Sequence, residues 1–113
     1  MEPRLATGVL VSALRRKAEA EGGFGAVLSK GDETAGAILV ILTERGAGPL
    51  VYERLLGPDG RYAWGPSTAS QPESAAEVPS FVARRRRFDP DLWVLELDVP
   101  SAERFAAEMV AFD

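Results

Sequence analysis

The chain has 113 residues, a net charge of −4 and neither histidine nor cysteine, and these properties already narrow its function. Without cysteine there are no disulfides, thiolate metal sites or thiol nucleophiles, and without histidine the commonest general base and zinc ligand is missing. An acidic chain of this length, with 46% hydrophobic residues, is typical of one cytoplasmic globular domain and not of a nucleic-acid-binding protein.

Hydrophobic periodicity divides the chain into helices and strands. Apolar residues at spacings of three and four predict helices, short runs of branched or aromatic residues predict strands, and Gly/Pro/Asp clusters between them predict turns. The predicted elements are, in chain order, a helix over residues 5–21, strands over 24–29, 36–44, 50–56 and 61–64, a helix over 78–88, a strand over 92–99 and a final helix after Pro100-Ser101.

These elements predict an α+β fold over residues 1–113: a mostly antiparallel sheet of four or five strands covered by three helices. The first strands are expected to form a meander, with Gly31-Asp32 as a two-residue hairpin turn and a break over residues 45–49. The run GAILVILTE (36–44) does not alternate, which is typical of a central strand buried on both faces and favours α/β/α layers. Residues 65–76, rich in Ser, Pro and Ala, predict a flexible surface loop.

The final helix is expected to begin with Ser101 as its N-cap, since a serine side chain can accept a bond from a free N–H of the first turn. Its predicted apolar stripe consists of Ala102, Phe105, Ala106, Met109 and Val110.

Four consecutive arginines, Arg84–Arg87, form the densest charge cluster. Successive helical positions advance by about 100°, so these side chains spread around the helix and do not form one basic face. Basic residues in a last turn interact favourably with the helix dipole, and Pro90 disfavours helical geometry at Asp89. The run is therefore interpreted as the end of a helix, and no nucleic-acid partner is expected.

Arg85 is the one arginine predicted to face the core. The apolar stripe of its helix consists of Val78, Phe81, Val82 and Phe88. A guanidinium in that stripe needs a partner, and the carboxylates of Asp89 and Asp91 are nearest in sequence. Arg85, Asp89, Asp91 and the neighbouring Trp93 are therefore the candidate functional or structural cluster.

Three aromatic residues on the third and fourth strands, Tyr52, Tyr62 and Trp64, are the candidate partner surface. The alternative interpretation is that they pack the sheet. A short edge strand at residues 61–64 would also allow two copies to pair through their sheets.

Three segments resemble an uncharacterised bacterial family, domain-of-unknown-function family 1491. They are ALRRKAEAEGGFGAV (13–27), KGDETAGAILV (30–40) and RRFDPDLWVLELD (86–98), of which RFDPDLWV is the most specific. The resemblance implies a small cytosolic α/β protein, known mainly from alphaproteobacteria, with no assigned activity or catalytic residues. The stretch LLGPDGRYAWGPSTASQPES departs from the family pattern.

Taken together, these observations favour a non-enzymatic accessory or protein-interaction module with no cofactor, metal or membrane partner, acting as a homo-oligomer or with another protein. The alternative is a small enzyme that uses Asp or Glu, with or without a divalent metal, and Arg on a phosphorylated or acylated substrate. A deep pocket lined by Asp89, Asp91 and an arginine would favour the enzyme, whereas an unpaired strand edge would favour the module.

Overall fold

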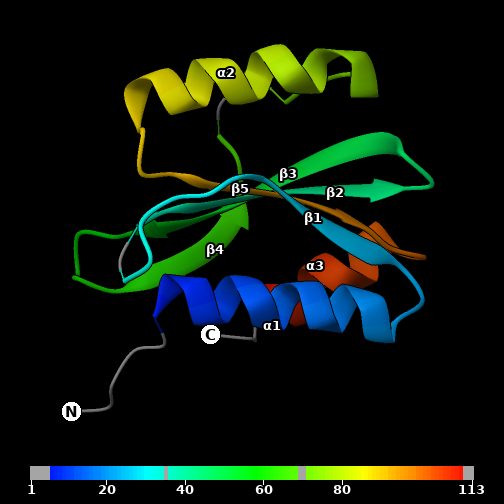
Figure 1. Ribbon diagram of the computed structural model, residues 1–113, viewed down its shortest axis with the longest axis horizontal. Coiled ribbons are helices and arrows are strands. Elements are labelled where there is room, and N and C mark those ends of the chain that lie inside the picture. The colour runs from blue at the N-terminus through cyan, green and yellow to red at the C-terminus, as the bar shows by residue number, and fades with distance from the viewer. Residues whose placement is uncertain (1–5, 35, 69–70, 111–113) are drawn as a thin grey trace.

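The computed structural model describes residues 6–34, 36–68 and 71–110. Within these residues the chain forms three α-helices, five strands and a short 3-10 helix (Figure 1). Their bounds are α1 Thr7–Ala20, β1 Phe24–Ser29, β2 Ile38–Glu44, β3 Ala47–Leu56, β4 Tyr62–Pro66, η1 Ala75–Glu77, α2 Val78–Phe88, β5 Trp93–Asp98 and α3 Ala102–Val110.

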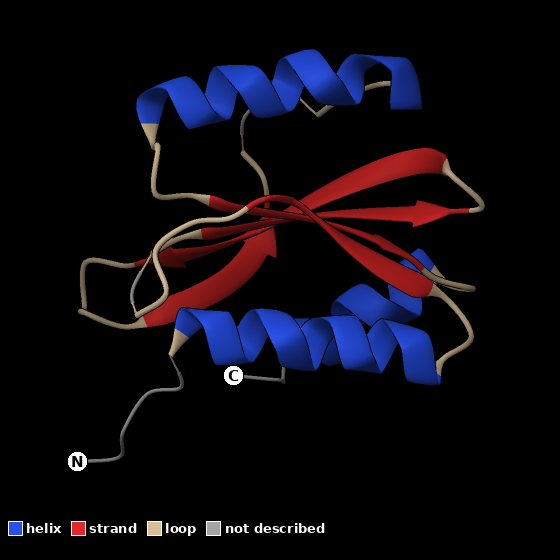
Figure 2. Cartoon of the chain, viewed as in Figure 1, coloured by secondary structure: helices blue, strands red, loops and turns tan. Residues whose placement is uncertain are grey.

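The five strands form one sheet in the order β1-β5-β2-β3-β4, in which β2 and β5 run parallel and the other neighbours antiparallel. Helix α2 covers one face, and α1 and α3 cover the other (Figure 2). The predicted α+β class, the mostly antiparallel sheet and the α/β/α layers are therefore confirmed. Strand β2 is central, as its apolar run predicts, and its first six residues are buried.

The predicted meander is correct for β2, β3 and β4 but wrong for β1, because β5 lies between β1 and β2. Strand β5 has apolar side chains on both faces, and an interior position in the sheet buries them. Strand β1 is only partly buried and lies at the edge. Gly31-Asp32 is accordingly not a hairpin turn: the Asp32 N–H donates to the Asp91 carbonyl at 3.1 Å. Gly31 packs so closely on the segment between α2 and β5 that a side chain at this position would collide with the backbone of Asp91 and Leu92.

The hairpin between β2 and β3 is tighter than the predicted break. Only Arg45 and Gly46 form its turn, with φ of 53° and 76°, the left-handed geometry of a two-residue type I′ turn. The Asp98 carboxylate at the end of β5 accepts from their N–H groups at 3.1 and 2.6 Å and from the Thr43 hydroxyl at 2.9 Å. Asp98 therefore fixes the turn.

The sheet separates two hydrophobic clusters. The larger, beneath α1 and α3, includes Leu14, Val40, Leu95, Phe105 and Met109. The smaller, beneath α2, includes Leu39, Ile41, Val51, Phe81 and Val94. Two residues assigned to apolar stripes lie outside both clusters: Phe88 is 84% exposed at the end of α2, and Val110 is half exposed at the end of α3.

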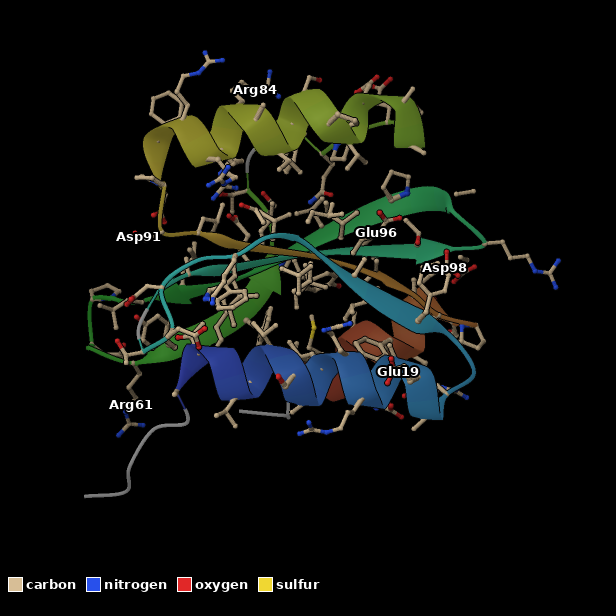
Figure 3. All side chains as sticks on the ribbon, viewed as in Figure 1. Glu19, Arg61, Arg84, Asp91, Glu96 and Asp98 are labelled. Carbon is tan, nitrogen blue, oxygen red and sulfur yellow. The ribbon has the colours of Figure 1, made fainter. Side chains whose placement is uncertain are left out.

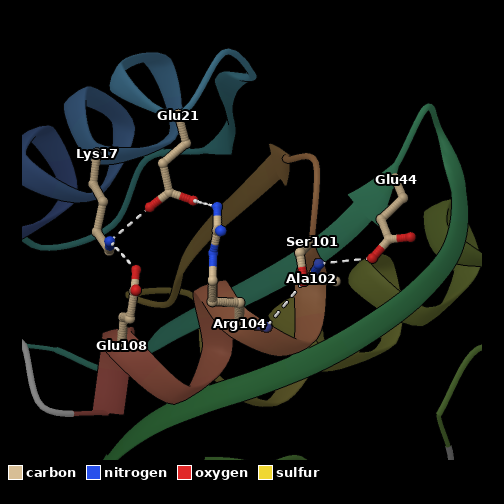
Figure 4. A network of polar contacts seen from close by, with 7 residues as sticks. All are labelled: Lys17, Glu21, Glu44, Ser101, Ala102, Arg104 and Glu108. Carbon is tan, nitrogen blue, oxygen red and sulfur yellow. Dashed lines mark hydrogen bonds and ion pairs between the residues drawn. The ribbon is translucent and has the colours of Figure 1, made fainter.

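Helix α3 is joined to its surroundings by polar contacts at both ends. The Ser101 hydroxyl accepts from the Arg104 N–H at 3.3 Å, which is the predicted cap, and Glu44 accepts from the Ala102 N–H at 2.7 Å. Lys17 on α1 donates to Glu21 at 2.7 Å and to Glu108 at 2.6 Å (Figure 4). Its ammonium also lies 5.1 Å from the centre of the Phe105 ring, so one lysine links the two helices.

Candidate interaction surface

Arg85 faces the sheet, but its partner is not the one predicted. The guanidinium pairs with the carboxylate of Glu53 on β3, and the side chains are 25% and 6% exposed. Arg85 follows Val78 and Phe81 at helical spacing, so its side chain points down at the sheet and not along the chain toward the Asp-Pro-Asp turn. The prediction that Arg85 is partly buried and paired with a carboxylate is confirmed, and the prediction that this carboxylate is Asp89 or Asp91 is wrong.

The other members of the predicted cluster do not gather around Arg85. Asp89 accepts from the Asp91 N–H at 3.2 Å, a local turn contact, and the Asp91 side chain is exposed near the end of the sheet where β5 begins (Figure 3). Trp93 lies in the cluster on the opposite face of the sheet, where its indole N–H donates to the Asp32 carbonyl at 2.6 Å. The four residues therefore do not line a common site.

The predicted aromatic surface is mostly folded into the molecule. Trp64 is buried, Tyr52 packs against the larger cluster, and the half-buried Tyr62 ring lies 4.3 Å from the Arg54 guanidinium. Binding of a partner through the exposed parts of these rings stays a prediction.

Two acidic side chains that lie beside the same cavity, Glu44 and Asp98, already make structural hydrogen bonds. A polar cavity of about 520 Å³ lies between the β2–β3 turn and the start of α3. Glu44 and Asp98 line this cavity, but they cap α3 and hold the turn. Among residues 6–34, 36–68 and 71–110, no three Asp, Glu, His or Cys side chains are grouped so that they could hold a metal ion.

Among the residues that the structure describes, no strand pairs with the outer edge of β1, where only the Gly25 carbonyl has a side-chain contact, a long one of 3.4 Å from the Arg15 Nε. This strand, FGAVLS, contains no charged residue and no proline. Phe24, Val27 and Leu28 are 58%, 37% and 45% exposed. Strands at sheet edges usually carry charges, prolines or a cover that prevents pairing with another chain, so an uncharged, apolar edge is unusual.

An apolar cavity adjoins this edge on the α2 face. It has a volume of about 440 Å³ and is lined by apolar side chains together with Thr43 and Glu96; the apolar ones are Leu28, Ala75, Val78, Pro79 and Val82. Helix α2 lies over the middle of the sheet and packs on β2, β3 and β5, so its N-terminal half leaves a space above β1. The edge strand and the cavity together form one surface, which we call the β1 surface: Phe24, Ala26, Val27, Leu28, Val78, Pro79 and Val82.

The opposite edge of the sheet is better protected. Strand β4 ends in Gly65-Pro66, and proline has no N–H to donate to a further strand. Arg61 precedes it. The predicted loop over residues 65–76 is shorter than expected, because its first two residues belong to β4 and its last two to η1. It is also partly tied to the sheet, since the Gln71 side chain exchanges bonds with the Val51 N–H and carbonyl at 2.9 and 3.1 Å. Its mobility stays a prediction, and residues 69–70 lie outside the described residues.

Sequence reasoning did not single out the β1 surface. The available signal was the uncharged run FGAVLS next to two glycines. The run was assigned to the first strand of a meander, and only the observed strand order places it at the edge of the sheet.

The comparisons with known proteins agree with this fold. The model of a family described as "Protein of unknown function (DUF1491)" matches residues 5–107. The chain belongs to this family. The resemblance noted in the sequence is thereby confirmed. A search of the curated proteins gave no significant match.

Three solved structures are similar to the chain over nearly its whole length. A DUF1491 protein from Caulobacter crescentus has a crystal structure with 34% identity and a TM-score of 0.74, covering 90% of this chain and 94% of its own. An NMR structure from the same organism has 32% identity and a TM-score of 0.76, covering 92% and 94%. A solution structure from A. tumefaciens has 32% identity and a TM-score of 0.73, covering 91% and 92%.

These relatives show the family and the bacterial context, and the family description assigns no activity. Within the part of the chain that the structure describes, no helix combines the length and the apolar composition that crossing a bilayer requires.

Proposed function

We propose that this DUF1491 protein is a cytoplasmic protein-interaction module that binds its partner, a second copy or another protein, through the β1 surface. The observation that supports this proposal is the outer edge of β1, an uncharged strand whose Phe24 and Leu28 side chains are about half exposed. An exposed strand edge provides main-chain donors and acceptors, and neighbouring apolar pockets provide specificity for alternate side chains of an added strand.

The apolar cavity suits this mode of recognition. Residues directly opposite each other in the β1–β5 ladder share a face, and Ala26 pairs with Glu96, which lines the cavity. A strand added to β1 would direct every second side chain toward the same α2 face. One of these side chains would lie next to Leu28 and Val82.

Site-specific photocrosslinking in bacterial cells tests the proposal. A photoreactive amino acid at Leu28 is expected to give discrete crosslinked protein products, because this side chain lies in the contact. The matched control is the same amino acid at Ala63, an exposed position on the opposite edge strand, which should give none. Equal crosslinking at both positions, or none at Leu28, would contradict the proposal.

A further inference from the structure

We infer that the partner of the β1 surface is a second copy of this chain, paired antiparallel through β1 about a twofold axis near Ala26. This inference rests on the proposed function and names its partner. Two five-stranded sheets would then form one continuous sheet across the pair. A twofold contact requires the same surface to be complementary to itself, and three features of β1 meet this condition.

The first feature is the placement of apolar side chains. With Ala26 opposite Ala26 of the second copy, Phe24 lies opposite Leu28 and Gly25 opposite Val27. Phe24 and Leu28 are the most exposed side chains of the strand, and each would be covered by the other copy. Moving the register by two residues would place Phe24 opposite Lys30 or another Ala26, so the register about Ala26 matches apolar side chains best.

The second feature is the size of the residue at the axis. Opposed side chains of an antiparallel pair have Cβ atoms only about 4.5–5.5 Å apart. Alanine fits this distance without a clash and without charge.

The third feature is charge. Gly8, Ser12 and Arg15 of α1 line a cavity with Val27 and Lys30, so this face of the helix flanks β1. Glu19, four residues after Arg15, continues the face to the end of α1 that leads into β1 (Figure 3). Lys30 follows the other end of β1. Antiparallel pairing therefore directs Glu19 of each copy toward Lys30 of the other. Within its own copy the Lys30 ammonium pairs with Glu33 at 2.9 Å, but the lysine side chain is 67% exposed and has further N–H donors for a second carboxylate.

Pairing also has costs, which limit its strength. The Arg15 Nε donates to the Gly25 carbonyl at 3.4 Å, a long contact that a ladder would replace with a main-chain bond. A bulge between Val27 and Ser29 places Leu28 outside the regular ladder, so the main-chain bonds of the pair are limited to Gly25–Val27 and Phe24 meets Leu28 through side chains alone. Short, small interfaces are usually weak, and we expect a dimer that dissociates in the micromolar range.

Complementary substitutions at the axis test the register. We expect Ala26→Lys and Ala26→Asp each to weaken dimerisation at least tenfold in sedimentation equilibrium, because like charges would lie directly opposite each other. A one-to-one mixture should recover a dimer, since opposite charges then meet. Both variants should fold, because charged residues are common on edge strands, and circular dichroism checks this. Ala63→Lys on β4 is the matched control and should leave the dimer unchanged.

Charge exchange tests the α1 contact. Lys30→Glu and Glu19→Lys should each weaken the dimer about three- to tenfold, and the double variant should restore it, as expected for a reciprocal ion pair. A wild-type monomer at about 1 mM, a concentration at which even a weak interface associates, would overturn the inference, as would a mixture of the Ala26 variants that stays monomeric. If Leu28 then crosslinks to a different protein in cells, the proposed function remains supported and only the inference that the partner is a second copy is wrong.

Discussion

The two faces of the sheet are closed to different degrees. Beneath α1 and α3 the core is continuous and includes buried residues from both helices and from three of the strands, β2, β4 and β5. Beneath α2 the cluster is smaller, a buried carboxylate pairs with Arg85, and an open apolar cavity reaches β1. Two helices cover most of a five-stranded sheet, and one helix does not. The incompletely covered face is therefore where this molecule offers apolar surface to a partner.

The largest expected effect compares one phenylalanine on each face. Phe105 on α3 and Phe81 on α2 are both buried. We expect Phe105→Ala to reduce the free energy of unfolding by about 3–5 kcal/mol, because the closed face cannot collapse into the cavity. Phe81→Ala should cost less, since α2 can settle on a smaller cluster. Urea unfolding of both variants measures the difference, and equal losses would show that the two faces are equally closed.

A smaller effect is expected at the ion pair on the open face. Arg85→Ala leaves the buried Glu53 carboxylate without its partner, which should cost about 2–3 kcal/mol, below the 3–5 kcal/mol for a fully buried pair because Arg85 is partly exposed. This loss corresponds to a decrease in Tm of roughly 10 °C. Arg87→Ala, at an exposed position of the same helix, is the control and should change Tm very little. Similar shifts in the two variants would contradict the assigned pair.

The contact between α1 and α3 predicts a pH dependence on the closed face. Bonds to Glu108 and then Glu21 raise the pKa of Lys17 above 10.5, and the bond from Lys17 lowers the pKa of Glu108 below 4.5. The stabilisation from Lys17 is thus present below pH 10.5 and lost as pH rises through its raised pKa. That from Glu108 is present above pH 4.5 and lost as pH falls through its lowered pKa.

The Tm difference between the wild type and Lys17→Met measures this dependence. It should be constant between the two limits and shrink in both strongly acidic and strongly alkaline solution. A difference that does not change with pH would mean that Lys17 acts only through packing on Phe105.

The smallest effect is expected at Phe88. This side chain is 84% exposed, so Phe88→Ser should leave the free energy of unfolding within about 0.5 kcal/mol of the wild type. A larger loss, measured in the same urea titrations, would show that the end of α2 packs more tightly than the structure indicates.

Local elements of the fold could be predicted because their signals lie within a few residues. Both bounds of the strand 24–29 and of the helix 78–88 are as predicted, and β2 is central as its apolar run indicates. These features depend on periodicity, turn residues and helix ends, which are properties of contiguous sequence.

The strand order and the partner of Arg85 depend on residues distant in sequence. The helical phase of Arg85 shows that it faces the sheet, but it does not show that Glu53 lies opposite. Likewise, the composition of β1 fits either an interior or an edge strand until β5 is placed between β1 and β2. The candidate surface could not be predicted for this reason: exposure of Phe24 and Leu28 is a consequence of topology.

Amide hydrogen exchange, measured residue by residue at low and high protein concentration, tests most directly whether the β1 edge is the contact surface. Exchange reports the opening of individual backbone hydrogen bonds. We predict that protection of amides in β1, Phe24–Ser29, increases between about 10 µM and 1 mM protein, the range in which a weak dimer forms, while amides of β4 are unaffected. Protection that does not depend on concentration in β1, or that increases in β4 instead, would contradict the account.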